Sequence, residues 1–147
     1  MIYSRIEKYF KEDKLEELLK ECSESFEKIE YYSHSLRNKI IDNLSETDLA
    51  MKELTGIYMY LNVVCMIAET EKINRESLYY YERKLELENE GIKKVVGSQI
   101  EREASNHVKN YRRVRNIFEA YKNSCDRAIS VCQSSLKTWE REKGLKQ

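Results

Sequence analysis

The chain has 147 residues, with 26 basic and 26 acidic side chains that give a formal net charge of zero. It contains no proline and only four glycines, and 35% of its residues are charged, so turn-bounded β-strands are excluded. We therefore expect an all-α fold in which residues 1–147 form a single domain. No apolar run approaches the roughly 18 residues of a membrane helix, and the first residues lack a signal-peptide core. These features predict a cytoplasmic protein, in the host cell cytoplasm if a phage encodes it.

The first long helix is predicted over residues 14–43, where apolar side chains recur every three or four positions. Asp13 is its expected N-cap, since a carboxylate there can accept early backbone N–H groups. Ile2, Ile6 and Phe10 share one helical face, so residues 1–10 are expected to form a short helix before it.

The second helix is predicted over residues 46–90, opening at Ser45 with Asp48 in an imperfect capping box. Residues 54–68 are the most apolar stretch of the chain and are expected to form the centre of the core. Beyond Glu69 the pattern turns polar, and the helix either continues as a solvent-facing arm or breaks near Asn74. Gly91 is the expected stop.

A connector over residues 91–98 carries Lys93 and Lys94 and a second glycine, Gly97. Ser98 and Glu101 form a capping-box pattern, which predicts that a third helix runs over residues 99–143. About 45 helical residues span roughly 65–70 Å at 1.5 Å per residue, which is long for a compact domain of this size.

The third helix carries an apolar ladder with a seven-residue period, typical of a coiled-coil seam. The expected fold is therefore a long-helix bundle with a C-terminal heptad-patterned assembly helix, and we expect a homo-oligomer in preference to a monomeric bundle. The residues predicted to hold the oligomer together are Tyr111, Val114, Phe118, Tyr121, Cys125, Ala128, Cys132 and Trp139.

No catalytic or metal-binding pattern is present in the sequence. The four cysteines are isolated from one another and lie on apolar helical stripes, which indicates buried, reduced thiols. His34 and His107 stand on different predicted helices without a motif around either, and no phosphate-binding glycine loop occurs. We expect neither an enzyme nor a cofactor or metal.

Charge is unevenly distributed along the chain. Residues 46–90 hold 5 basic against 10 acidic side chains, whereas residues 91–147 hold 13 against 6. A cationic helix face can pair with phosphates in a largely sequence-independent way. The alternative is a solvated face with ion pairs inside the monomer or between subunits. The candidate nucleic-acid-binding residues are Lys93, Lys94, Lys109, Arg112, Arg113 and Arg115.

Eleven tyrosines form a second candidate feature, above all Tyr79, Tyr80 and Tyr81, which precede Arg83 and Lys84. Aromatic faces beside cations can stack on single-stranded bases. Packing between helices, with the hydroxyl groups reaching water, is the alternative interpretation.

With these features, the chain resembles the phage recombination mediators of the UvsY type. The stretch from Tyr111 to Leu136, including Ser124-Cys-Asp-Arg-Ala-Ile-Ser-Val-Cys-Gln133, is similar to the C-terminal assembly helix of that family. The basic-aromatic segment that the family uses on single-stranded DNA is echoed only by Met51-Lys52 and Tyr58. DNA binding would therefore fall to the cluster from Lys109 to Arg115 or to the connector lysines.

The resemblance implies a ring-like or bundled homo-oligomer that binds single-stranded DNA. Such a protein helps to load a RecA-like recombinase in place of a single-strand-binding protein, and both proteins are therefore possible partners. The competing hypothesis is a structural or scaffolding helical protein, such as a phage assembly factor or a coiled-coil adaptor, without a nucleic-acid role.

Overall fold

The computed structural model describes residues 1–92, 94 and 96–145. These residues form no strand, which confirms the predicted all-α fold class. No helix in this part of the chain is long and apolar enough to cross a bilayer. The helices are α1 (Ile2–Lys11), α2 (Leu15–Glu21), α3 (Ser23–Arg37), α4 (Leu44–Asn89), α5 (Gly97–His107) and α6 (Lys109–Leu145).

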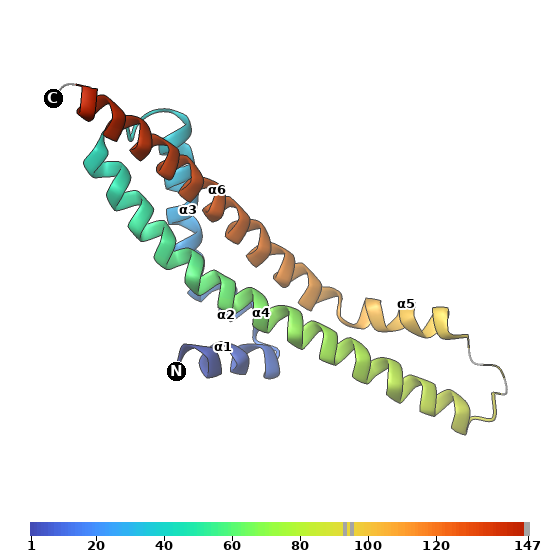
Figure 1. Cartoon of the computed structure of the whole chain (residues 1–147). Helices are drawn as coiled ribbons and strands as arrows, with labels where there is room; N and C mark the ends of the chain where they lie inside the picture. The colour runs from blue at the N-terminus through green and yellow to red at the C-terminus, as the bar shows by residue number, and fades with distance from the viewer. Residues whose placement is uncertain (93, 95, 146–147) are drawn as a thin grey trace.

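Two long helices, α4 and α6, run antiparallel along the length of the molecule (Figure 1). Helix α3 packs mainly on α6 toward the end that holds the C-terminus, α1 packs against the middle of α4, and α2 lies near α1 and contacts α1, α3 and α6. At the other end α5 lies along the second half of α4. The fold is thus a helical bundle that continues into a two-helix arm.

The core lies where α3, α4 and α6 meet. The predicted centre at residues 54–68 is confirmed, since Leu54, Leu61, Val64 and Ala68 are fully buried. Burial of each of these leucine and valine side chains contributes on the order of 1.5–3 kcal/mol to folding. The α4 helix continues without a break past Asn74. Of the two alternatives predicted there, a continuing arm or a break, the structure therefore shows the arm.

Three helices end with a residue in the left-handed backbone region, which turns the chain sharply. These residues are Asp13 after α1 (φ 57°), Lys39 after α3 (φ 56°) and Gly91 after α4 (φ 78°). In each case the next amide donates back into the last turn, as the N–H of Ile40 does to the carbonyl of Ser35 at 2.8 Å. This is the Schellman arrangement, which satisfies helix-end carbonyl groups.

The prediction of one helix over residues 14–43 is wrong. It is interrupted at Cys22, between α2 and α3, and it ends at Arg37 because Lys39 reverses the chain. Asp13 is not an N-cap, since Lys14 holds that position without a side-chain hydrogen bond. The short helix expected over residues 1–10 is present as α1.

The predicted helix starts at residues 46 and 99 are also displaced. The Asn43 side chain caps α4 by accepting from the N–H of Glu46 at 2.9 Å, so the helix begins at Leu44 instead of near Ser45. The capping box at Ser98 does not form, because α5 already begins at Gly97 and Ser98 lies inside its first turn.

The third predicted helix is two helices, α5 and α6, separated at Val108. Neither proline nor glycine occurs at this bend, and Val108 is fully buried. The ring of His107 stacks on Tyr79 of α4 at 4.5 Å, which fixes the end of α5 against the arm. The bend lets α5 and α6 each follow α4, as Figure 1 shows.

Side chains from α4 and α6 meet at the C-terminal end of α1. The Arg75 guanidinium donates to the carbonyl groups of Phe10 at 2.8 Å and Lys11 at 3.1 Å, and it lies 4.3 Å from the centre of the Tyr111 ring. The Tyr111 hydroxyl donates to the same Phe10 carbonyl at 3.1 Å and to Asp13 at 3.0 Å. Burial raises the pKa of Tyr111 to about 12, so its hydroxyl stays a donor.

Replacing Lys39 by glycine is expected to stabilise the fold by about 0.5–1 kcal/mol. A left-handed conformation costs an L-residue roughly 1–2 kcal/mol, and glycine avoids this cost. Part of the gain is offset because glycine gives the unfolded chain more conformational entropy. Lys39 is exposed and forms no ion pair within the described residues. Urea unfolding measures the change. Lys20→Gly, at an ordinary helical position in the last turn of α2, is the matched control and should destabilise. An unfolding midpoint for Lys39→Gly at or below wild type would contradict this prediction.

Candidate nucleic-acid interface

The apolar seam of α6 faces the other helices of the same chain. The Phe118 ring is fully buried 5.5 Å from Phe26 of α3, and Tyr121 stacks on that same Phe26 ring at 4.0 Å. The Cys125 thiol donates to the carbonyl of Leu54 at 3.1 Å. The seam is therefore occupied within one chain, and self-association needs a different surface. The remaining predicted seam residues are the buried Tyr111, Val114, Ala128 and Cys132 and the half-buried Trp139.

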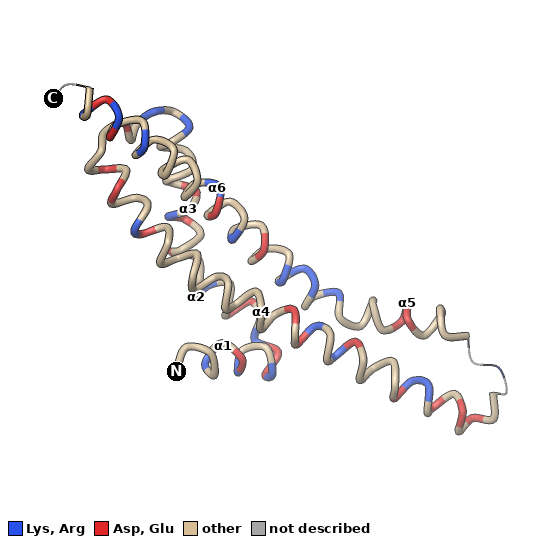
Figure 2. The backbone as a smooth tube through the Cα atoms, viewed as in Figure 1, with Lys and Arg blue, Asp and Glu red and all other residues tan. Residues whose placement is uncertain are grey.

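Cations cluster at the start of α6 (Figure 2), and the contacts of their side chains divide them into two groups. Arg115 is half-buried and bridges Glu69 of α4 at 3.2 Å and Glu119 at 3.1 Å, so it ties the two long helices together. Arg112 is half-buried and donates to the Ser105 hydroxyl at 2.7 Å. These two of the predicted DNA-binding residues are engaged inside the molecule.

The other two cations of this cluster face solvent. Arg113 is exposed and pairs with Glu16 of α2, while its Nε donates to Asn110 at 3.1 Å. Lys109 is exposed and has no carboxylate within ion-pair distance among the described residues. Both therefore remain at the surface, although only Lys109 lacks an acidic neighbour.

The connector lysines lie apart from this cluster. Lys94 is exposed at the tip of the arm, and α5, about 16 Å long at 1.5 Å per residue, separates it from α6. Lys93 lies outside the described residues. The structure thus does not bring Lys94 together with Lys109.

The surface of α6 opposite the seam is a continuous face without a carboxylate. At 100° per residue its members recur every three or four positions over about 48 Å. Arg127 and Arg141 extend the cationic character of this face beyond the cluster that the sequence analysis identified. The face, called here the outer α6 face, consists of the exposed residues Lys109, Arg113, Asn116, Ala120, Asn123, Arg127, Ser130, Ser134, Thr138 and Arg141.

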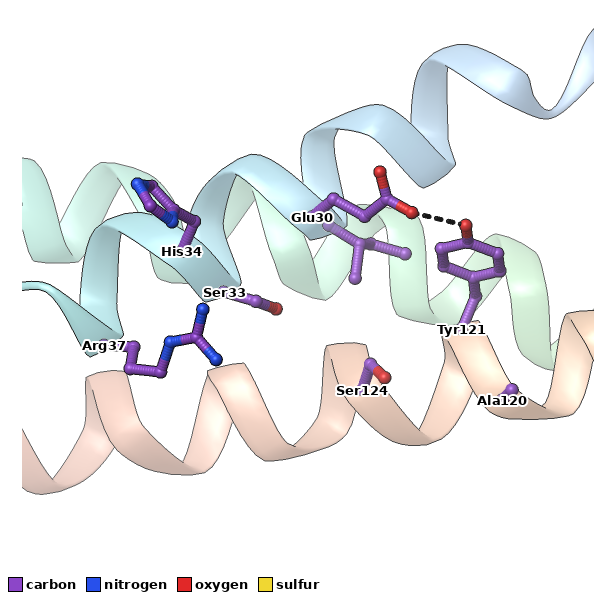
Figure 3. Close-up of a pocket in the computed structure, with 8 residues that line it drawn as sticks. Glu30, Ser33, His34, Arg37, Ala120, Tyr121 and Ser124 are labelled. Carbon is purple, nitrogen blue, oxygen red and sulfur yellow. Dashed lines mark hydrogen bonds between the residues drawn. The ribbon is translucent and has the colours of Figure 1, made fainter.

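A groove between α3 and α6 adjoins this face (Figure 3). It consists of two depressions of about 460 and 430 Å³ that share Ser33, Arg37 and Ser124. Ala120 and Arg127 line it and also belong to the outer α6 face. The groove, called here the α3–α6 groove, is thus a side pocket of the cationic face.

The chemistry of the groove suits a flat ring attached to an anion. Its small side chains, such as Ser33 and Ser124, leave space between the helices, and Figure 3 shows Arg37 reaching from α3 across this space. Arg37 and Arg127 come from opposite walls and form no ion pair within the described residues. At one end the Tyr121 hydroxyl donates to Glu30 at 2.6 Å, and this bond raises the pKa of Tyr121.

The tyrosines serve mainly to pack the helices together. Tyr79 stacks on His107, and Tyr60 lies 3.8 Å from the Cys22 sulfur. Tyr32 donates to Glu53. The exceptions are Tyr3, Tyr31 and Tyr81, which are 52%, 58% and 65% exposed.

All four cysteines are free and buried, as the sequence predicts. Burial raises the pKa of the Cys22, Cys65 and Cys125 thiols to about 11, so they are protonated and poorly nucleophilic at neutral pH. Over the described ranges, no three side chains of histidine, cysteine, aspartate or glutamate gather into a group that could hold a metal ion.

Comparison of this chain with protein-family models, with curated proteins and with solved structures found no match.

Proposed function

We propose that this chain is a cytoplasmic single-stranded-DNA-binding accessory protein that works as a homo-oligomer. The observation that carries the proposal is the outer α6 face, whose own residues include no carboxylate over about 48 Å and which lies beside the α3–α6 groove. The proposal includes no catalytic step, cofactor or metal.

In this proposal the DNA backbone follows the outer α6 face. Lys109, Arg113, Arg127 and Arg141 pair with phosphates, and the neutral Asn and Ser side chains between them add hydrogen bonds. A base turned toward the protein enters the α3–α6 groove, where Arg37 reaches its phosphate. Unstacked bases are available in single strands, which favours single-stranded over duplex DNA.

A role in loading a RecA-like recombinase in place of a single-strand-binding protein is supported by the resemblance of residues 111–136 to UvsY-type mediators. In that role both proteins are partners. The matching assay is the DNA-dependent ATPase rate of a RecA-like recombinase on DNA coated with single-strand-binding protein. This chain is expected to raise that rate.

The salt dependence of binding tests the DNA interface. We expect a fluorescent oligo-dT to bind with an affinity that falls with salt at a slope of about −3 in log–log form, since four phosphate contacts at roughly −0.7 each give that value for single strands. Fluorescence anisotropy at several salt concentrations measures the slope. No change in anisotropy, even at low salt, would remove the DNA-binding proposal.

The scaffolding alternative is favoured by a specific observation, the internal use of charge. Arg113 pairs with Glu16 and Arg115 with Glu69, so part of the basic excess of α6 is neutralised inside the monomer. A chain that assembles normally but binds no DNA would be explained by this alternative.

A further inference from the structure

One face of α4 stays exposed along the middle of the helix. Its apolar members are Met59, Met66 and Ile73, which are seven residues apart and 66%, 62% and 48% exposed. Between and beside them lie small or neutral polar residues, from Thr55 to Ser77 at three- and four-residue spacings. This surface, called here the α4 stripe, contains no charged residue in a chain that is 35% charged.

The charged residues of this face lie beyond the two ends of the α4 stripe: Asp48 and Lys52, which pair with each other at 2.9 Å, lie at one end, and Lys84 lies at the other. Asp48 precedes Met66 by 18 residues, and Lys84 follows it by 18. In an antiparallel helix pair with a two-fold axis at Met66, each residue of one copy faces a residue of the other copy. The two residues are equally far from Met66 in sequence, in opposite directions along the chain. Asp48 then faces Lys84, Met59 faces Ile73, and Met66 faces its own copy. The stripe is therefore complementary to itself in apolar character, and Asp48 of one copy lies opposite Lys84 of the other.

We propose that two copies of this chain pair through the α4 stripe as an antiparallel two-fold dimer centred on Met66. This inference rests on the self-association in the proposed function, but not on DNA binding. A contact that runs from residue 48 to residue 84 is about 54 Å long. With a helix face about 10 Å wide, the surface area buried on both copies together is roughly 1,100 Å². This area is at the lower end of the range for specific interfaces. The dimer is accordingly reversible, with a dissociation constant on the order of micromolar.

The same pairing completes the arm. Beyond Arg75, which still contacts α1 and Tyr111 of α6, α4 is joined to α5 by the Arg83–Glu103 ion pair at 3.1 Å and the Tyr79–His107 stack. In the dimer, residues 70–84 of one copy lie along residues 48–62 of the other. The arm thereby gains a third helix from the bundle end of its partner.

Sedimentation velocity of the full chain without DNA, at about 1–100 µM, tests the dimer. We expect a reversible monomer–dimer equilibrium. Met66→Lys places two ammonium groups on the axis and should weaken the dimer at least tenfold. Leu78→Lys is the matched control, because Leu78 is 58% exposed on a different face of α4. A monomer at every concentration, or equal dimerisation of the two variants, would overturn the proposal.

A charge exchange tests the antiparallel register. Asp48→Lys should weaken the dimer several-fold, and Asp48→Lys combined with Lys84→Asp should restore it. Failure of the second change to restore the dimer would overturn the register. If Met66→Lys does not fold, Met66→Cys replaces it: mild oxidation should cross-link this variant into a covalent dimer, whereas Leu78→Cys should form no cross-linked dimer. A dimer that binds no DNA would leave this inference intact and refute only the DNA-binding proposal.

Discussion

Replacing Phe118 by alanine is expected to lower the free energy of unfolding by about 3–5 kcal/mol, the usual cost of removing a fully buried aromatic ring. Phe118 is 0% exposed and packs against Phe26, which itself stacks on Tyr121. The cavity would open at the meeting point of α3, α4 and α6. Urea unfolding followed by circular dichroism measures the change.

The control for this prediction is Val131→Ala, on the same helix. Val131 is 48% exposed, so its loss should cost less than about 1 kcal/mol. The comparison also separates two roles for the α6 seam. If the α6 seam bound a second copy of the chain, Phe118→Ala would abolish the oligomer and leave the stability of the monomer unchanged. An unchanged unfolding midpoint would therefore contradict the buried position described above.

Reversing two charges on the outer α6 face is expected to weaken single-stranded DNA binding by at least tenfold. The variant Lys109→Glu with Arg127→Glu removes two phosphate contacts and brings two carboxylates toward the backbone. Both side chains are exposed, and neither forms an ion pair within the described residues, so the fold should be preserved. The salt slope should fall in magnitude by about 1.4, since two contacts at roughly 0.7 each are lost.

Lys20→Glu with Arg102→Glu is the control for this variant. It changes the net charge by the same amount, at exposed positions on α2 and α5 outside the outer α6 face. Binding by the control should stay within a few-fold of wild type. Equal loss in the two variants would mean that DNA responds to the net charge of the protein and not to the outer α6 face.

The sequence pattern predicts the fold class and which face of each long helix is buried, but not the neighbour that buries it. The ladder through Phe118 marks an apolar face with the right period. Its principal neighbour Phe26 lies 92 positions earlier, and periodicity carries no information about that pairing. Gly91 was recognisable as a helix stop. Asp13 and Lys39 adopt the same left-handed conformation without glycine, so no composition signal marks them.

The candidate site was predictable only in part. The density of cations from Lys109 to Arg115 marks the start of α6, but the sequence does not show that Arg115 pairs with Glu69 of another helix. A projection of the whole helix at 100° per residue would have added Arg141 and Arg127. The α3–α6 groove could not be found in this way, because Arg37 and Arg127 are 90 residues apart and meet only through tertiary packing.

The junction of Arg75 and Tyr111 at the end of α1 has a consequence for synthesis of the chain. The Tyr111 hydroxyl reaches the carbonyl of Phe10 across 101 positions, and Arg75 reaches it across 65. During synthesis α1 thus lacks the Tyr111 contact until the start of α6 has been made. The contacts at this end of α1 are therefore completed only after α6 begins, although α1 itself packs mainly against α4.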